Sequence, residues 1–107
     1  MGIVDNLETL LARGQDSALL RFSLGSEYLK LGDLPKSILH LQRAVELDPG
    51  YSAAWKLYGK ALVQAGRAAE SVRVFDAGIQ AARERGDVQA AKEMEVFRRR
   101  AIKATGD

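Results

Sequence analysis

The chain contains no cysteine and a single histidine among its 107 residues. The absence of thiols excludes a disulfide framework, a thiolate nucleophile and a cysteine-ligated metal site. The lone histidine, His40, cannot assemble the usual zinc site either, because such sites need several histidine or cysteine ligands. We therefore expect neither a metal nor another cofactor. His40 directly precedes Leu41 of an apolar stripe, so we expect its side chain to face solvent.

Long hydrophobic runs are also missing from the chain. No stretch approaches the roughly 20 apolar residues that a membrane-spanning helix requires. Residues 1–6 lack the basic region and the apolar core of a signal peptide. These features predict no membrane partner, and our expectation is a cytoplasmic location.

The sequence shows no constellation that would support catalysis. Its serines lack a neighbouring base with the geometry that a nucleophile needs. Its glycines do not form a phosphate-binding loop, because they recur at a regular long spacing rather than within one short segment. We therefore predict that the protein is not an enzyme.

The net charge of the chain is small but unevenly distributed. The net charge of +2 is too small to indicate a polyanionic partner, although residues 51–107 carry eleven basic and seven acidic side chains. Arg98, Arg99, Arg100 and Lys103 form the one basic cluster, and a helix spreads consecutive residues by about 100° each. The cluster therefore lacks the coherent basic face, interleaved with stacking aromatics, that nucleic-acid binding requires. We expect a solvated helix end and consider nucleic acid an unlikely partner.

A repeat of 34 residues organises the chain. One copy reads Trp55-x-x-Tyr58-Gly59 and continues as Ser71-x-x-x-Phe75. Moving back by the repeat length gives the matching positions Arg21, Leu24, Gly25, Tyr28, Ser37 and Leu41. In this pattern the chain resembles the tetratricopeptide-repeat family. The resemblance implies an all-α fold in which antiparallel helix pairs stack as a right-handed superhelix, with a concave groove that binds peptides or partner helices.

The repeat frame also divides the chain, which we expect to form one domain over residues 1–107. The expected parts are an N-terminal half-repeat helix at 3–13, a first repeat at 18–51, a second repeat at 52–85 and a C-terminal capping helix at 87–104. An alternative for the first segment is a frayed amphipathic leader. We expect Gly14, Gly32, Gly66 and Gly86 just outside helix ends, where a left-handed residue costs least.

The last helix breaks the repeat register. A strict frame would place Lys92 and Glu93 at core positions, and burial of unpaired charge is costly. Its apolar stripe consists of Ala90, Ala91, Met94, Phe97 and Ala101, which requires a slip of about two residues.

The resemblance implies a binding groove lined by the first helix of each pair, through its second, fifth, ninth and twelfth repeat positions. In this sequence those positions are Leu19, Phe22, Ser26 and Leu29 in the first repeat and Ala53, Lys56, Lys60 and Val63 in the second, and we add Lys92 from the last helix. The lysine and asparagine clamp that some members use for a C-terminal carboxylate is absent, because Phe22 and Ser26 occupy its positions.

These residues predict a groove with an apolar half and a basic half. Our first hypothesis is a non-catalytic scaffold or adaptor that binds a protein or peptide partner bearing apolar and acidic residues. The alternative is a structural module that self-associates as a homodimer through its terminal helices or its groove, since two full repeats fall short of the three usually needed to complete a stack.

Overall fold

Local sequence signals set where each helix begins and ends. The side chains of Ser17, Asp33 and Asp87 each accept a hydrogen bond from a backbone N–H of the following turn, which satisfies one donor that a helix start leaves free. The four boundary glycines follow helix ends with φ between 76° and 85°, a left-handed conformation that glycine adopts at little cost. The predicted positions of Gly14, Gly32, Gly66 and Gly86 are thereby confirmed.

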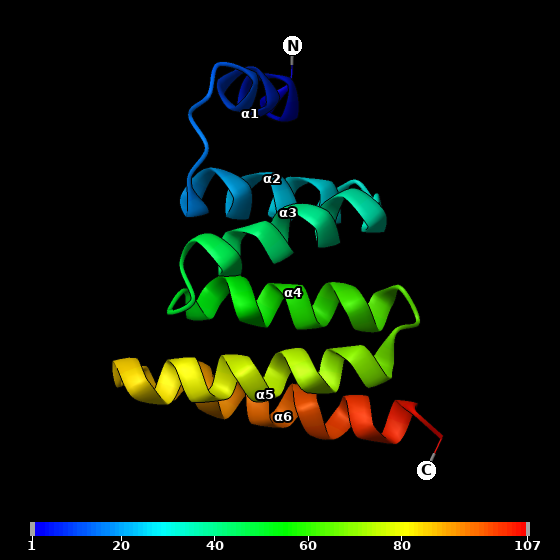
Figure 1. Ribbon diagram of the computed structural model, residues 1–107. Coiled ribbons are helices and arrows are strands. Elements are labelled where there is room, and N and C mark those ends of the chain that lie inside the picture. The colour runs from blue at the N-terminus through cyan, green and yellow to red at the C-terminus, as the bar shows by residue number, and fades with distance from the viewer. Residues whose placement is uncertain (1, 107) are drawn as a thin grey trace.

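The computed structural model describes residues 2–106, which form six α-helices and no strand (Figure 1). The helices are α1 (Ile3–Ala12), α2 (Ala18–Lys30), α3 (Leu34–Leu47), α4 (Ser52–Gln64), α5 (Ala68–Arg85) and α6 (Val88–Ala104). They run back and forth in one stack, with α1 at one end and α6 at the other, and α2 packs on α3 while α5 packs on α6. The predicted all-α fold is confirmed. None of the helices in 2–106 is both long enough and apolar enough to cross a bilayer.

The sequence pair Asp48-Pro49 predicts a helix with Asp48 as its cap and Pro49 as its first residue, but α4 does not start there. The helix begins at Ser52 instead. The Asp48 carboxylate accepts a hydrogen bond from the Gly50 backbone N–H, and the Pro49 carbonyl accepts one from the indole N–H of Trp55 at 2.7 Å. These contacts stabilise a turn ahead of the helix, so the capping carboxylate serves the turn rather than α4.

Three clusters of buried side chains hold the stack together. One lies between α3, α4 and the start of α5, a second joins α5 to α6, and a third lies on α2 beneath α1. Trp55 packs against both the first and the second cluster, so its indole ring links neighbouring helix pairs.

The two-residue slip of α6 is confirmed. Met94 is fully buried, Lys92 is exposed and Glu93 is half-buried. The slip arises because α3 and the connection after it take 14 and 4 residues, whereas α5 and its connection take 18 and 2. The second helix of the second pair, with its connection, therefore uses 20 residues where that of the first pair uses 18, and every side chain of α6 moves two positions along the chain.

The first helix packs only on one side of α2. Val4, Leu7, Leu10 and Leu11 lie against Leu20, Leu24 and Tyr28. None of the residues of α1 is fully buried. Whether α1 and α6 count as a half repeat and a cap remains a prediction, as does the assignment of the two repeats to 18–51 and 52–85.

Candidate functional site

The predicted groove lysines lie where α4 faces α6. The Lys56 Nζ is 3.1 Å from a carboxylate oxygen of Glu93. One turn further along α4, the Lys60 Nζ lies 5.1 Å from the centre of the Phe97 ring. Among residues 2–106 Lys60 has no acidic side chain within ion-pair distance. The two lysines, which the sequence presents as equivalent, therefore differ: Lys56 is neutralised inside the chain and Lys60 is not.

The predicted apolar residues of α2 have less uniform surroundings. The Phe22 ring packs on Tyr51, with ring centres 5.0 Å apart, and Leu29 packs against the cluster between α3 and α4. Leu19 is 65% exposed and borders a surface hollow that Leu7 and Leu10 of α1 also line. Phe22 and Leu29 thus lie beside α4, whereas Leu19 belongs to the α1 end of the stack.

The remaining predicted groove residues differ in how much of each side chain is exposed. Ser26 is half-buried, while Ala53 and Lys92 are exposed and Val63 is 38% exposed. We use the name α2/α4/α6 face for the predicted groove residues on these three helices, which are Phe22, Ser26, Leu29, Ala53, Lys56, Lys60, Val63 and Lys92.

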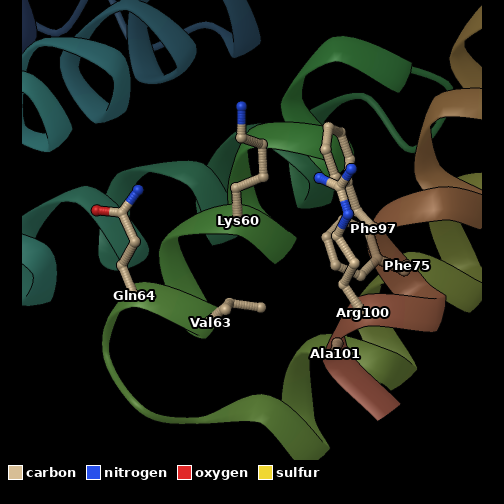
Figure 2. Close-up of a pocket in the computed structure, with 7 residues that line it drawn as sticks. All are labelled: Lys60, Val63, Gln64, Phe75, Phe97, Arg100 and Ala101. Carbon is tan, nitrogen blue, oxygen red and sulfur yellow. The ribbon is translucent and has the colours of Figure 1, made fainter. Parts of the chain in front are cut away.

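The structure adds a pocket that the sequence does not predict. It has a volume of about 240 Å³ and is bordered by α4, α5 and α6, and we call it the Phe97 pocket. Figure 2 shows its lining residues, which are Lys60, Val63, Gln64, Phe75, Phe97, Arg100 and Ala101. The guanidinium carbon of Arg100 lies 5.8 Å from the centre of the Phe97 ring. The pocket therefore combines an aromatic wall with two cations and no acidic side chain.

Sequence reasoning missed this pocket because it assigned Phe97 to the core and Arg100 to a solvated helix end. In the structure Phe97 is only half-buried, against Phe75 at a ring-centre distance of 6.1 Å. Residues 97, 100 and 101 share one helix face, since positions three and four apart are neighbours. That spacing was the available signal. The three arginines also have different surroundings, because Arg98 pairs with Asp76 and Arg99 is exposed.

His40 contradicts the expectation of a solvated side chain, because only 6% of it is exposed. Its ring stacks on the Tyr28 ring, with ring centres 5.6 Å apart and an angle of 5° between the ring planes. Arg21 donates a hydrogen bond to its Nδ1 at 3.0 Å. A guanidinium cannot accept, so Nδ1 carries a lone pair and the proton lies on Nε2, 3.9 Å from Glu8. The side chain is covered because Glu8 of α1, which also accepts from the Tyr28 hydroxyl, closes over it.

We expect His40 to make folding sensitive to mild acid. Burial, followed by the Arg21 charge, lowers the pKa of His40 from its usual 6.5. Near pH 6.5 the unfolded chain therefore binds a proton on this ring while the folded chain does not. The free energy of unfolding is highest above that pH and falls as the pH drops below it, by at most about 1.4 kcal/mol per pH unit.

Urea unfolding at pH 7.5 and pH 5.5 checks this expectation. The native chain should lose stability at the lower pH, and His40→Gln should lose clearly less. The hydrogen bond from Arg21 lowers the pKa of Asp16 from its usual 3.8. The titration of Asp16 therefore affects stability only below about pH 3.8, outside the range that is compared. Equal losses in the two proteins would contradict the account of His40.

A row of stacked helix pairs is the architecture of a helical-repeat protein. In this chain the neighbouring first helices present apolar and basic side chains. The comparison with protein families identifies the kind of repeat. The family model described as tetratricopeptide repeat matches residues 28–94, which is more than half of the chain, and the chain belongs to this family. Tetratricopeptide-repeat domains are in general protein–protein interaction modules and are typically non-catalytic.

Individual relatives agree with this assignment. The chain is 49% identical over 102 residues to the TPR repeat-containing protein PA0015 of Pseudomonas aeruginosa, covering 95% of this chain and 97% of the relative. The solution structure of protein BPP2914 from Bordetella parapertussis matches with a TM-score of 0.82 and 41% identity, covering 96% of this chain and 90% of that one. The TPR2B domain of yeast Sti1, determined in a complex with pHsp70, matches with a TM-score of 0.86 over 94% of this chain and 80% of that one. At 20% sequence identity, this structural match supports the similarity of fold alone.

Proposed function

We propose that the protein is a non-catalytic adaptor that binds a protein or peptide partner in a groove formed by the α2/α4/α6 face. The partner segment carries apolar and acidic residues. The observation that carries the proposal is the position of Lys60, an exposed cation without an acidic partner in residues 2–106, beside a half-buried aromatic ring. Membership of a family of interaction modules supports the general function, and cytoplasmic location is part of the same proposal.

The apolar half of the groove is supplied by α2. Phe22 and Leu29 are half-buried and lie beside α4, so part of each side chain remains available to a partner. Apolar and aromatic anchors near the centre of an interface usually provide most of its affinity. The basic half begins one helix away, which gives a partner both kinds of contact across a short distance.

Charge reversal tests this proposal. Lys56→Glu with Lys60→Glu should abolish capture of the native partner from lysate while the chain stays folded. The side chains of the Lys56–Glu93 pair are 32% and 40% exposed, and surface pairs of this kind contribute at most about 1 kcal/mol. Phe22→Ala should weaken capture as well. High salt should weaken the contribution of the lysines, because it screens charge, but it should not weaken the contribution of Phe22.

The matched control reverses two exposed arginines elsewhere, Arg13→Glu with Arg73→Glu. It produces the same change in net charge outside the α2/α4/α6 face and should leave capture unchanged. Unchanged capture by the doubly reversed lysine variant would show that the partner binds another surface. Circular dichroism melting of each variant separates a loss of binding from a loss of folding.

Self-association is the second candidate, and the outer end of the stack favours it. Ile3 and Leu31 are 57% and 69% exposed and border the same hollow between α1 and α2. Exposed apolar side chains that gather in this way often mark an interface. Sedimentation at two protein concentrations without a ligand decides between the candidates: a mass that doubles with concentration supports the homodimer, and a constant monomer mass rejects it.

A further inference from the structure

We infer that the Phe97 pocket takes one large apolar side chain of a partner segment whose neighbouring residues carry carboxylates. The inference rests on the proposed function, and it names both the subsite and the partner chemistry. A pocket of about 240 Å³ lies below the roughly 300–1,000 Å³ typical of small-molecule sites. Its size therefore suits a single side chain better than a cofactor or a metabolite.

The walls of the pocket specify the apolar part of this ligand. Phe97 provides aromatic surface and Val63 provides aliphatic surface, while the buried Phe75 and Ala101 form the floor. Figure 2 shows Val63 on α4 across from the α6 side chains. A leucine or phenylalanine side chain placed between them would lose much of its contact with water, and this loss is the main source of favourable free energy in such contacts.

The rim of the pocket specifies the charge. Lys60 and Arg100 reach it from different helices, and neither has an acidic partner within residues 2–106. Of the other cations on these helices, Lys56 pairs with Glu93 and Arg98 pairs with Asp76, whereas Lys92, Arg99 and Lys103 do not line the pocket. Within the part of the chain that the structure describes, the pocket rim thus carries two unpaired positive charges and no acidic side chain, and it complements carboxylates.

The same rim favours side-chain carboxylates over a chain terminus. Lys60, Gln64 and Arg100 are all exposed, so the donors lie in solvent at the mouth rather than inside the pocket. A buried terminal carboxylate needs donors that surround it, because an incompletely paired charge is costly away from water. Aspartate or glutamate side chains on either side of the apolar anchor meet exposed cations without this cost.

The inference is tested with a defined probe. The probe is a ten-residue peptide, blocked at both ends, with one phenylalanine between two glutamates in a glycine–serine background. Nitrogen-15 NMR of the full chain follows its titration to millimolar concentration. We expect saturable shifts of the amides around Lys60, Phe97 and Arg100. Replacing the phenylalanine of the probe by alanine should weaken binding roughly tenfold or more, and replacing its glutamates by glutamine should weaken it roughly two- to fivefold for each carboxylate removed.

Two single substitutions provide a matched pair on the protein. Arg100→Gln removes a rim charge, whereas Arg99→Gln removes a neighbouring exposed charge that does not line the pocket. We expect only Arg100→Gln to weaken the probe by roughly two- to fivefold. Equal weakening by both would reduce the effect to net charge and overturn the inference. The inference is also overturned if no saturable shifts occur, or if the alanine probe binds as well as the phenylalanine probe.

The outcome for the pocket is separate from the outcome for the proposed function. If charge reversal at Lys56 and Lys60 abolishes partner capture but the probe does not bind, the groove function stands and the pocket assignment fails. If the probe binds at the pocket while partner capture is unchanged by the reversal, the pocket stands and the groove function fails.

Discussion

Gly59→Ala is expected to destabilise the native chain by about 2–3 kcal/mol, although alanine is the better helix former. A methyl carbon at position 59 would lie 2.3 Å from a ring carbon of Phe75, far inside van der Waals contact. The Phe75 ring is fully buried between α4, α5 and α6, so it cannot move aside without displacing its neighbours. Overpacking of this kind costs about 1–3 kcal/mol and sometimes more.

The effect should change sign when the ring is removed. Phe75→Ala alone should cost about 3–5 kcal/mol because it opens a cavity in the core. In that background the methyl carbon meets no ring, so Gly59→Ala should gain up to about 1 kcal/mol from helix propensity. Chemical unfolding of the four proteins of this cycle measures the effect. Gly2→Ala is the control, because a Cβ there meets nothing within 4 Å and only a helix-cap preference of less than about 1 kcal/mol is lost.

Two results would contradict this account of the α4–α5 contact. One is a cost for Gly59→Ala below about 1 kcal/mol in the native chain, which is smaller than overpacking predicts. The other is the same cost with and without the Phe75 ring. Either result would mean that the two helices lie further apart than the structure places them.

Removal of residues 1–14 is expected to lower the melting temperature by roughly 10–20 °C. Four half-buried side chains of α1 cover the cluster on α2. Each contributes about 1 kcal/mol if half of a full burial is counted, which is a large part of the roughly 5–15 kcal/mol that stabilises a small domain. Deletion also removes Glu8, which accepts a hydrogen bond from Tyr28 and covers His40.

The deletion distinguishes a structural helix from a frayed leader. Asn6→Ser provides the control, since this side chain is exposed and lies outside both the hollow between α1 and α2 and the cluster on α2, and it should leave the melt unchanged. An unchanged melt after deletion would mean that α1 does not stabilise the stack. Calorimetry or circular dichroism is sufficient for both variants.

The sequence predicts the fold well because the repeat pattern links several levels of structure. The positions of Leu24, Tyr58 and Phe75 follow from one 34-residue frame, and these side chains lie in the core. Glycine at helix ends needs only local backbone reasoning, so Gly32 and Gly66 were also predictable. Such features depend on spacing along the chain and do not require knowledge of side-chain contacts between helices.

The sequence predicts the candidate site less completely, because the site depends on which side chains meet across helices. Glu93 neutralises Lys56 only because α6 slips by two residues, and the positions are 37 residues apart. His40 is buried because Glu8 and Arg21 converge on it from two other helices. The Phe97 pocket arises from the same slip, which places an aromatic ring beneath Lys60. Contacts of this kind leave no regular spacing in the sequence.

The central claim is that a partner binds on the α2/α4/α6 face, and hydrogen–deuterium exchange of the chain with its captured partner tests it most directly. The account predicts slower exchange in α4 and α6, over the segments that contain Lys60 and Phe97, and little change in the outer part of α3 around the exposed Leu39. Protection of α3 with no change in α4 and α6 would contradict it.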